Sequence, residues 1–161
     1  MCSSVLALER DLELLQWLDT LGFNEAYIGE HHSAGWETIA SPELFMATAA
    51  ERTRHIRLGT GVTSLPYHHP FMVANRMVLL DHLTKGRVIL GCGPGALASD
   101  ALMLGIKPER QRAMMEESLD RSEDGTRLNS SHGVSSYAVC CVKKKNTTLI
   151  DQSPDYTTQP P

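Results

Sequence analysis

The sequence predicts a parallel α/β fold, on the strength of three observations. Short apolar stretches begin near Ala26, Ile56 and Arg87, separated by about 30 residues, which is the length of a strand–helix–strand unit. Segments with helical periodicity lie between these stretches, and the alternation predicts parallel strands joined by right-handed crossovers. The composition, with 42% hydrophobic and 21% charged residues among 161, is typical of a globular domain.

The helices are predicted from apolar spacing and from residues that begin or end a helix. Leucines recur at helical spacing over residues 8–21, and Gly22 supplies the stop. Residues 41–52 begin with the Ser-Pro signature of an N-cap followed by a first-turn proline. Further helices are predicted over 70–86 and 108–121, each beginning at a proline. The predicted strands are residues 25–31, 56–62 and 87–91.

The character of the sequence changes after Arg121. Residues 122–161 have neither helical nor strand periodicity and are rich in Ser, Thr, Asn and Lys, which predicts a disordered tail. One interpretation is an ordinary flexible C-terminus. However, residues 127–132 followed by 136–145 resemble the translation of a sequencing adapter and a poly-adenosine run. We therefore interpret 122–161 as a segment that is not native, and we assign no function to its side chains.

The charge pattern and the N-terminus exclude several classes of protein. The formal net charge is -4, and no block of lysine or arginine provides a surface for nucleic acid or an anionic membrane. The first residues have no basic stretch followed by an apolar one, and no apolar run approaches the roughly 18 residues of a membrane span. We expect a cytoplasmic protein that binds neither nucleic acid nor membrane and keeps its four cysteines reduced.

Polar residues that could take part in catalysis stand at the carboxyl end of the first predicted strand. Glu30, His31 and His32 stand there, and in parallel α/β barrels catalytic groups lie at the carboxyl ends of strands. The alternative is that the two histidines are ordinary polar residues at a strand end. A second pair, His68 and His69, follows the next strand, but neither pair has the spacing of a zinc site. No metal is expected.

Glycine-rich segments follow the other two strands. Small residues over 59–62 would let a flat ring or a phosphate approach the backbone, although glycines that only turn the chain are an equal alternative. Residues 91–95 could form a nest of backbone N–H groups that binds an anion. This second segment lacks the order of a dinucleotide-binding fingerprint, and Pro94 removes one donor.

Taken together, the strand-end motifs resemble the luciferase-like flavin-dependent monooxygenases. The resemblance extends over about residues 6–120, and residues 93–97 and 99–101 resemble the limonene-monooxygenase-like branch. It implies that residues 1–121 form a partial luciferase-like domain, about half of a (β/α)8 TIM barrel. The first strand and the last four strand–helix units of the barrel have no counterpart in the sequence. The matching segments are Leu21–His32, Ile56–Val62, Leu65–Pro70 and Leu80–Arg87.

The resemblance also implies roles for particular residues. His31 corresponds to the histidine assigned to catalysis beside the flavin ring. The resemblance implies a non-proline cis peptide bond between Gly61 and Val62, beneath the isoalloxazine. Pro94 stands where luciferase has an arginine near the flavin phosphate, so this contact must come from elsewhere. The residues expected to bind the cofactor are Glu30, Thr60, Gly61, Val62, Gly93 and Pro94.

The function implied by the resemblance is oxygenation of a small apolar organic substrate with O2 and reduced FMN. A partner flavin reductase would supply the reduced FMN, and the parent enzyme is expected to be a homo-oligomer. Two alternatives remain: a deazaflavin-dependent oxidoreductase of the same superfamily, and a non-catalytic fragment that self-associates. A partial barrel has unpaired sheet edges, which favour self-association. The chain by itself is expected to be inactive, because it keeps only three of the strand-end loops from which a flavin site is assembled.

The change in character near Arg121 leads to a prediction about the gene. We expect the genomic reading frame to diverge from this sequence within a few codons of Asp120 and to continue into further strand–helix units. Sequencing the locus and its transcript through the Asp120 codon tests this expectation. A native transcript that encodes residues 122–161 unchanged contradicts it.

Overall fold

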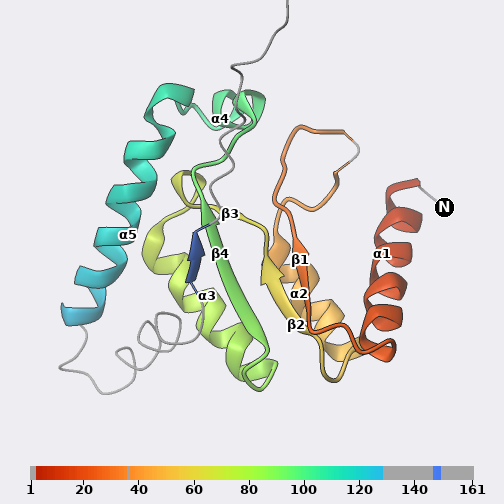
Figure 1. The fold of residues 1–161 in the computed structure, drawn as a ribbon. Coiled ribbons are helices and arrows are strands. Elements are labelled where there is room, and N and C mark those ends of the chain that lie inside the picture. The colour runs from red at the N-terminus through yellow and green to blue at the C-terminus, as the bar shows by residue number, and fades with distance from the viewer. Residues whose placement is uncertain (1–2, 36, 129–146, 150–161) are drawn as a thin grey trace, which may run out of the picture.

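The computed structural model describes residues 3–35, 37–128 and 147–149, and it contains a parallel sheet flanked by helices (Figure 1). The strand order is β1-β2-β4-β3, and β5 pairs with β4. Every strand pairing is parallel, which confirms the predicted sheet. The strands are β1 (Glu25–Ile28), β2 (Arg57–Thr60), β3 (Thr63–Ser64), β4 (Val88–Gly93) and β5 (Thr147–Leu149).

Proline marks the start of two predicted helices, as expected. Pro42 and Pro70 occupy the first turn, where a missing backbone N–H costs nothing. The first helix begins at Ser3 rather than Leu8, because no helix-breaking residue separates the two. None of the helices among the described residues is long and apolar enough to cross a membrane. The helices are α1 (Ser3–Thr20), α2 (Pro42–Arg52), α3 (Pro70–Leu83), α4 (Ala98–Met103) and α5 (Gln111–Leu128), with 3-10 turns at Leu65–Tyr67 and Pro108–Arg110.

Two elements correct the prediction that residues after Arg121 have no regular structure. Helix α5 continues to Leu128, because no proline interrupts residues 121–128, although they lack an apolar periodicity. Strand β5 lies parallel to β4, with Leu90 opposite Thr147. Its pairing uses backbone groups, which a search for apolar alternation does not detect. The prediction of disorder for 129–146 and 150–161 lies outside the described residues.

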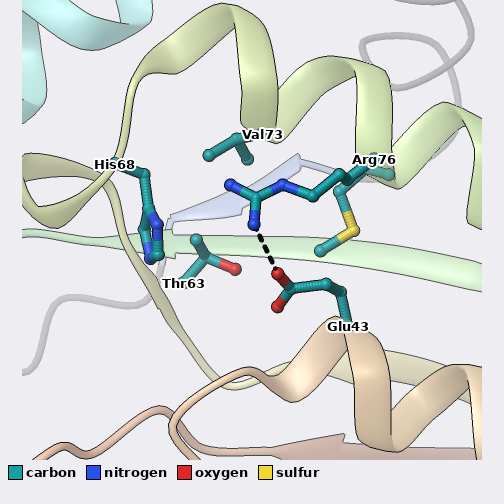
Figure 2. A pocket seen from close by; sticks show the side chains of 6 residues that line it. Glu43, Thr63, His68, Val73 and Arg76 are labelled. Carbon is teal, nitrogen blue, oxygen red and sulfur yellow. Dashed lines mark hydrogen bonds and ion pairs between the residues drawn. The ribbon is translucent and has the colours of Figure 1, made fainter.

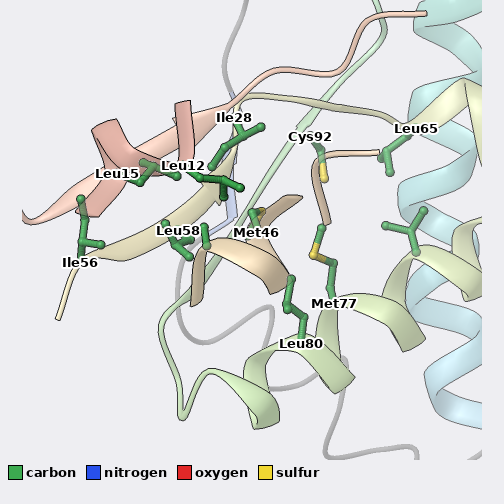
Figure 3. Close-up of a cluster of buried hydrophobic side chains, with 12 residues drawn as sticks. Leu12, Leu15, Ile28, Met46, Ile56, Leu58, Leu65, Met77, Leu80 and Cys92 are labelled. Atoms are coloured by element: carbon green, nitrogen blue, oxygen red, sulfur yellow. The ribbon is translucent and has the colours of Figure 1, made fainter. Parts of the chain in front are cut away.

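The main hydrophobic core lies between the sheet and helices α1, α2 and α3 (Figure 3). Met46 of α2 and Leu58 of β2 have no exposed surface, and Met77 of α3 packs in the same cluster. Of the leucines that predicted the first helix, Leu12 and Leu15 are buried in the core, while Leu21, just after the end of α1, is 67% exposed. The sheet is therefore covered by helices on the face that carries Ile28 and Leu58.

Charged side chains tie successive units together at the amino ends of the strands. The Asp19 carboxylate accepts backbone hydrogen bonds from Arg54, His55 and Ile56, at 2.7, 2.8 and 2.6 Å, and so links the end of α1 to the start of β2. The Arg87 guanidinium donates to the carbonyls of Ala50 and Ile56 and to the Thr53 hydroxyl, which links the start of β4 to the end of α2.

The pairing between β2 and β4 changes register before β3 begins. Gly59 lies opposite Ile89, whereas Thr63 lies opposite Cys92, so one residue is left over between these pairs, as in a β-bulge. At the change, the Thr60 hydroxyl donates to the Gly91 carbonyl at 2.8 Å and accepts from the Gly91 N–H at 3.0 Å. One buried hydroxyl thus replaces a pair of backbone hydrogen bonds.

This contact predicts that Gly91 does not tolerate a side chain. A Cβ at Gly91 would clash with the backbone carbonyl of Thr60, so Gly91→Ala should lower the free energy of unfolding by about 1–3 kcal/mol or more, as overpacking does. Gly29→Ala is the matched control, because its Cβ would meet no atom closer than 3.9 Å. Urea unfolding of both variants, followed by circular dichroism, measures the difference. Equal stabilities would contradict the assigned contact.

Candidate active site at the carboxyl ends of the strands

The candidate site is built by three segments that follow β1, β2 and β4 at one edge of the sheet (Figure 1). After β1, the His31 N–H donates to the Ile39 carbonyl at 3.1 Å, which folds the 29–39 loop back on itself. After β2, the Gly61 N–H donates to the Ile28 carbonyl at 2.7 Å and holds the second segment against the first. The sequence-predicted residues of both segments therefore lie side by side.

The Glu30 carboxylate is the centre of the polar contacts in this region. Its side chain is fully buried, and its Oε1 lies 2.7 Å from His68 Nε2 and 3.0 Å from His32 Nε2. The other oxygen, Oε2, accepts a hydrogen bond from the Ser64 N–H at 2.7 Å. One carboxylate thus joins the loop after β1, strand β3 and the turn that precedes α3.

These contacts decide the charge of Glu30. Burial by itself raises the pKa of a carboxyl group, because the ionised form loses hydration. At Glu30 the hydrogen bond and the charge of His68, with further hydrogen bonds from Ser64 and His32, outweigh burial and hold the pKa below its ordinary value of 4.5. Glu30 is therefore an ionised carboxylate near neutral pH, with acceptor sites only.

His31, the predicted catalytic residue, is partly exposed and has one free ring nitrogen. Its Nε2 lies 2.8 Å from Glu37 Oε2, and its side chain is 32% exposed. Its Nδ1 is buried and has no hydrogen-bond partner among the described residues. The nearest carboxylate oxygen is Asp100 Oδ2 at 3.6 Å, which is too long for a hydrogen bond.

Asp100 fixes the loop that carries both histidines. This residue of α4 is 1% exposed, and its carboxylate accepts hydrogen bonds from the His32 N–H and the Ser33 hydroxyl. Burial raises the pKa of Asp100, but the Ser33 and His32 hydrogen bonds outweigh it and hold the pKa below the ordinary value. Asp100 lies in the 99–101 motif noted in the sequence, but its contacts were not predicted because its partners, His32 and Ser33, are far away along the chain.

Gly61 and Val62 lie beside His31 and adopt the expected backbone geometry. The Gly61–Val62 peptide bond is cis, which confirms the geometry that the resemblance implied. A Cβ added to Gly29 would lie 3.9 Å from both the Gly61 carbonyl oxygen and His31 Cδ2, so the two loops are neighbours. Val62 is 9% exposed.

The third segment, at the end of β4, reaches the same region. A Cβ on Gly93 would collide with the Val62 side chain, so Gly93 is packed directly against the second segment. Gln111 of α5 donates through Nε2 to the Pro94 carbonyl at 3.0 Å and to the Tyr67 hydroxyl at 2.8 Å. Gln111 gave no signal in the sequence, because its partners are a backbone carbonyl and a hydroxyl far away along the chain.

A small hollow lies on the helix side of the same segments (Figure 2). Its volume is about 210 Å³, which includes open solvent. Arg76 and Glu43 form an ion pair of 2.9 Å at the hollow. The Thr63 hydroxyl, which is buried, has no hydrogen-bond partner among the described residues. The lining residues are Glu43, Thr63, His68, Val73, Arg76 and Met77.

The structure gives His68 a role that the sequence suggested only weakly. The His68–His69 pair drew notice as possible metal ligands, but within the described ranges no group of three or more His, Cys, Asp or Glu side chains is arranged to hold a metal ion. Instead His68 bonds to Glu30, which lies 38 positions earlier. The signal that could have found it was its position in the segment that follows a predicted strand, the same feature that drew attention to His31.

A parallel sheet with helices on its face and polar side chains gathered at the carboxyl ends of its strands defines part of a (β/α)8 barrel with a strand-end site. The sequence pattern of the family described as luciferase-like monooxygenase matches residues 3–150, and the chain belongs to this family. The predicted family and the partial barrel fold are both confirmed.

Two curated relatives are similar over most of this chain. The 4-hydroxyprotoasukamycin monooxygenase of Streptomyces nodosus subsp. asukaensis is 67% identical over 115 residues, which are 71% of this chain and 31% of the relative. Limonene 1,2-monooxygenase of Rhodococcus erythropolis is 63% identical over 114 residues, which are 71% of this chain and 30% of the relative. The chain thus spans less than a third of the length of these curated relatives.

Solved structures also match most of this chain and about a third of their own length. The oxygenating constituent of 3,6-diketocamphane monooxygenase from Pseudomonas putida, a type II Baeyer-Villiger monooxygenase in complex with FMN, matches with a TM-score of 0.69 and 31% identity. The match covers 74% of this chain and 34% of that one. An F420-dependent secondary alcohol dehydrogenase, at 20% identity, a TM-score of 0.62 and coverage of 72% and 37% of the two chains, shows the same fold.

The Asp100 contacts predict a stability difference that depends on pH. Asp100→Asn places an amide N–H₂ against donors, so we expect a loss of about 1–3 kcal/mol of unfolding free energy at neutral pH. The folded pKa of Asp100 lies below its ordinary value of 3.8, so the carboxylate's contribution is complete above that pH and is lost as the pH falls through the folded pKa. The difference between the two proteins should therefore shrink below about pH 3.8.

Urea unfolding at several pH values measures this difference. Asp11→Asn, on the surface of α1, is the matched control and should show no comparable loss. A neutral-pH stability of Asp100→Asn equal to that of the unsubstituted chain would contradict the role of Asp100.

Proposed function

We propose that this chain is part of an FMN-dependent monooxygenase, which uses reduced FMN and O2 to add one oxygen atom to a small apolar organic substrate. The observation that carries the proposal is His31, whose buried Nδ1 has no partner among the described residues, beside Gly61 and Val62 at the carboxyl ends of β1 and β2. The relatives named as monooxygenases and the neighbour in complex with FMN support the same reading.

The residues at this edge fit a flavin. An unpartnered buried nitrogen at His31 is a polar group that a ligand can satisfy, since such groups are rarely left alone in folded proteins. Gly61 and Val62, followed by Gly93 and Pro94 after β4, offer backbone and small side chains to a planar ring. When it is bound, reduced FMN supplies the electrons for the reaction with O2.

The protein groups divide into those that face the cofactor and those that support them. In our proposal the His31 imidazole holds or moves a proton at the reacting centre, which is the usual work of an imidazole in such a position. Thr60 supports the site without contacting the cofactor, because its hydroxyl is buried and bonded to both backbone groups of Gly91. Glu30 likewise supports the site without contacting the cofactor, because its carboxylate is buried and bonded to protein groups.

The partners of the proposed enzyme follow from its relatives. The P. putida neighbour is described as an oxygenating constituent, which is the form of an enzyme that works with a second component. We propose that a flavin reductase supplies reduced FMN to this enzyme, that the enzyme is a homo-oligomer, and that it works in the cytoplasm. The deazaflavin alternative is supported by fold alone, at 20% identity, and is therefore the weaker reading.

A second candidate, a non-catalytic fragment that self-associates, is favoured by one observation. Helix α1 has exposed apolar side chains on the surface away from the core, with Trp17 69% and Leu14 55% exposed. Patches of this kind mark association surfaces. This candidate concerns the 161-residue chain by itself, whereas the monooxygenase proposal concerns the enzyme to which it belongs.

Transplantation tests the monooxygenase proposal. Residues 6–120 would replace the aligned segment of limonene 1,2-monooxygenase of R. erythropolis, which is 63% identical over 114 residues. We expect the folded chimaera to bind FMN and to oxygenate a substrate. In the chimaera, His31→Ala should lower the oxygenation rate by roughly 10²-fold or more, the scale of lost acid–base assistance, with FMN affinity unchanged within a few-fold.

His82→Ala, in the last turn of α3, is the control and should retain the full rate. A folded chimaera that binds no FMN would overturn the proposal. Equal oxygenation rates in the His31→Ala and His82→Ala chimaeras would instead remove His31 from the chemistry and leave the cofactor assignment in place.

A further inference from the structure

The contacts of Glu30 constrain where hydrogens lie on two neighbouring histidines. The Ser64 N–H donates to Oε2, and this donor is fixed because a backbone amide has no acceptor nitrogen. The other oxygen, Oε1, faces the Nε2 atoms of His32 and His68 at 3.0 and 2.7 Å. An ionised carboxylate has about four acceptor positions and no hydrogen to give. Both Nε2 atoms must therefore carry a hydrogen.

A neutral imidazole has one N–H and one bare nitrogen. With the hydrogen on Nε2, the bare nitrogen of each ring is Nδ1, which is free to accept a proton or a hydrogen bond. Imidazole rings that bond to a carboxylate through one nitrogen have the tautomer and the orientation of the other nitrogen fixed in this way. Glu30 thus selects the same tautomer for two rings at once.

The rings of His68 and His32 lie in different surroundings. The His68 ring lines the hollow between α2 and α3, where the buried Thr63 hydroxyl has no partner among the described residues (Figure 2). The His32 ring meets Tyr67 edge-on, with 5.8 Å between ring centroids, and its backbone N–H is held by Asp100 beside His31. One carboxylate therefore joins the helix side of the sheet to the strand-end site.

We propose that Glu30 is a positioning residue that fixes both His32 and His68 as Nε2–H tautomers, so that His32, the neighbour of His31 in the chain, keeps a bare Nδ1 as a second proton acceptor. The role of His32 rests on the proposed function. The tautomers themselves do not, because they follow from the hydrogen bonds of the chain without any cofactor.

The substitution Glu30→Gln makes a distinctive prediction. The Ser64 N–H still needs an oxygen, so the amide oxygen takes the place of Oε2 and the N–H₂ group takes the place of Oε1. That group can only donate, so both imidazole Nε2 atoms must become acceptors. Glu30→Gln should therefore invert both rings from the Nε2–H to the Nδ1–H tautomer. A carboxylate that merely fills space would produce no such inversion.

Nitrogen-15 NMR of the histidine rings measures the tautomers directly. The 161-residue chain would be labelled with ¹⁵N-histidine, studied without flavin at about pH 9, well above the ordinary histidine pKa, and assigned with single His→Gln variants. In the unsubstituted chain, Nε2 of His32 and His68 should resonate as protonated nitrogens. In Glu30→Gln both signals should move to the region of bare nitrogens. Glu25→Gln, which alters an exposed carboxylate bonded to Tyr27 and Arg57, should change neither signal.

The outcomes separate this proposal from the proposed function. Bare Nε2 atoms in the unsubstituted chain overturn it, whatever happens to the variants. A folded Glu30→Gln chain with both tautomers unchanged also overturns it. If that variant does not fold, the unsubstituted chain and the His68→Gln variant decide, because the introduced amide can still donate to Oε1 and His32 should keep its Nε2–H. Failure of the chimaera to bind FMN would leave these tautomers unaffected.

Discussion

The buried carboxylate of Glu30 is the interaction on which this edge of the sheet depends. It holds three pieces of chain that no strand pairing joins: the loop after β1, the end of β3 at Ser64 and the turn before α3. A charge in this position is tolerated because the Ser64 N–H and the His32 and His68 rings donate hydrogen bonds to it. Removing the donors would leave an uncompensated buried charge, which costs about 3–5 kcal/mol. The polar network and the position of His31 are therefore parts of one arrangement.

The same network accounts for the histidines at the strand ends not being arranged as metal ligands among the described residues. Metal ligation requires bare imidazole nitrogens that converge on one point. Here the Nε2 atoms of His32 and His68 converge on Oε1 of Glu30, and the Nδ1 of His31 lies beside Asp100. The imidazole Nε2 atoms of His32 and His68 are thus engaged by a carboxylate of the protein itself, which leaves them unavailable as ligands.

Much of the fold could be predicted from sequence because apolar spacing and prolines are local signals. Helices α2 and α3 begin at Pro42 and Pro70 as predicted, and the parallel sheet followed from the order of elements. Strands β3 and β5 were missed because a two-residue and a three-residue strand are too short for periodicity. At the site, His31 was predicted from its position after a strand. The Asp100 contact was not, because it joins residues 68 positions apart.

The ties made by Asp19 and Arg87 have a consequence for how this architecture can change. Both lie at the amino ends of the strands, opposite the candidate site, and each binds the backbone of the neighbouring strand–helix unit. In such barrels the amino edge contributes stability while the carboxyl edge contributes chemistry. The loops after β1, β2 and β4 can therefore diversify without loosening the joints between units. That separation of the two rims lets one scaffold accumulate new specificities over evolutionary time while its folding cooperativity is preserved.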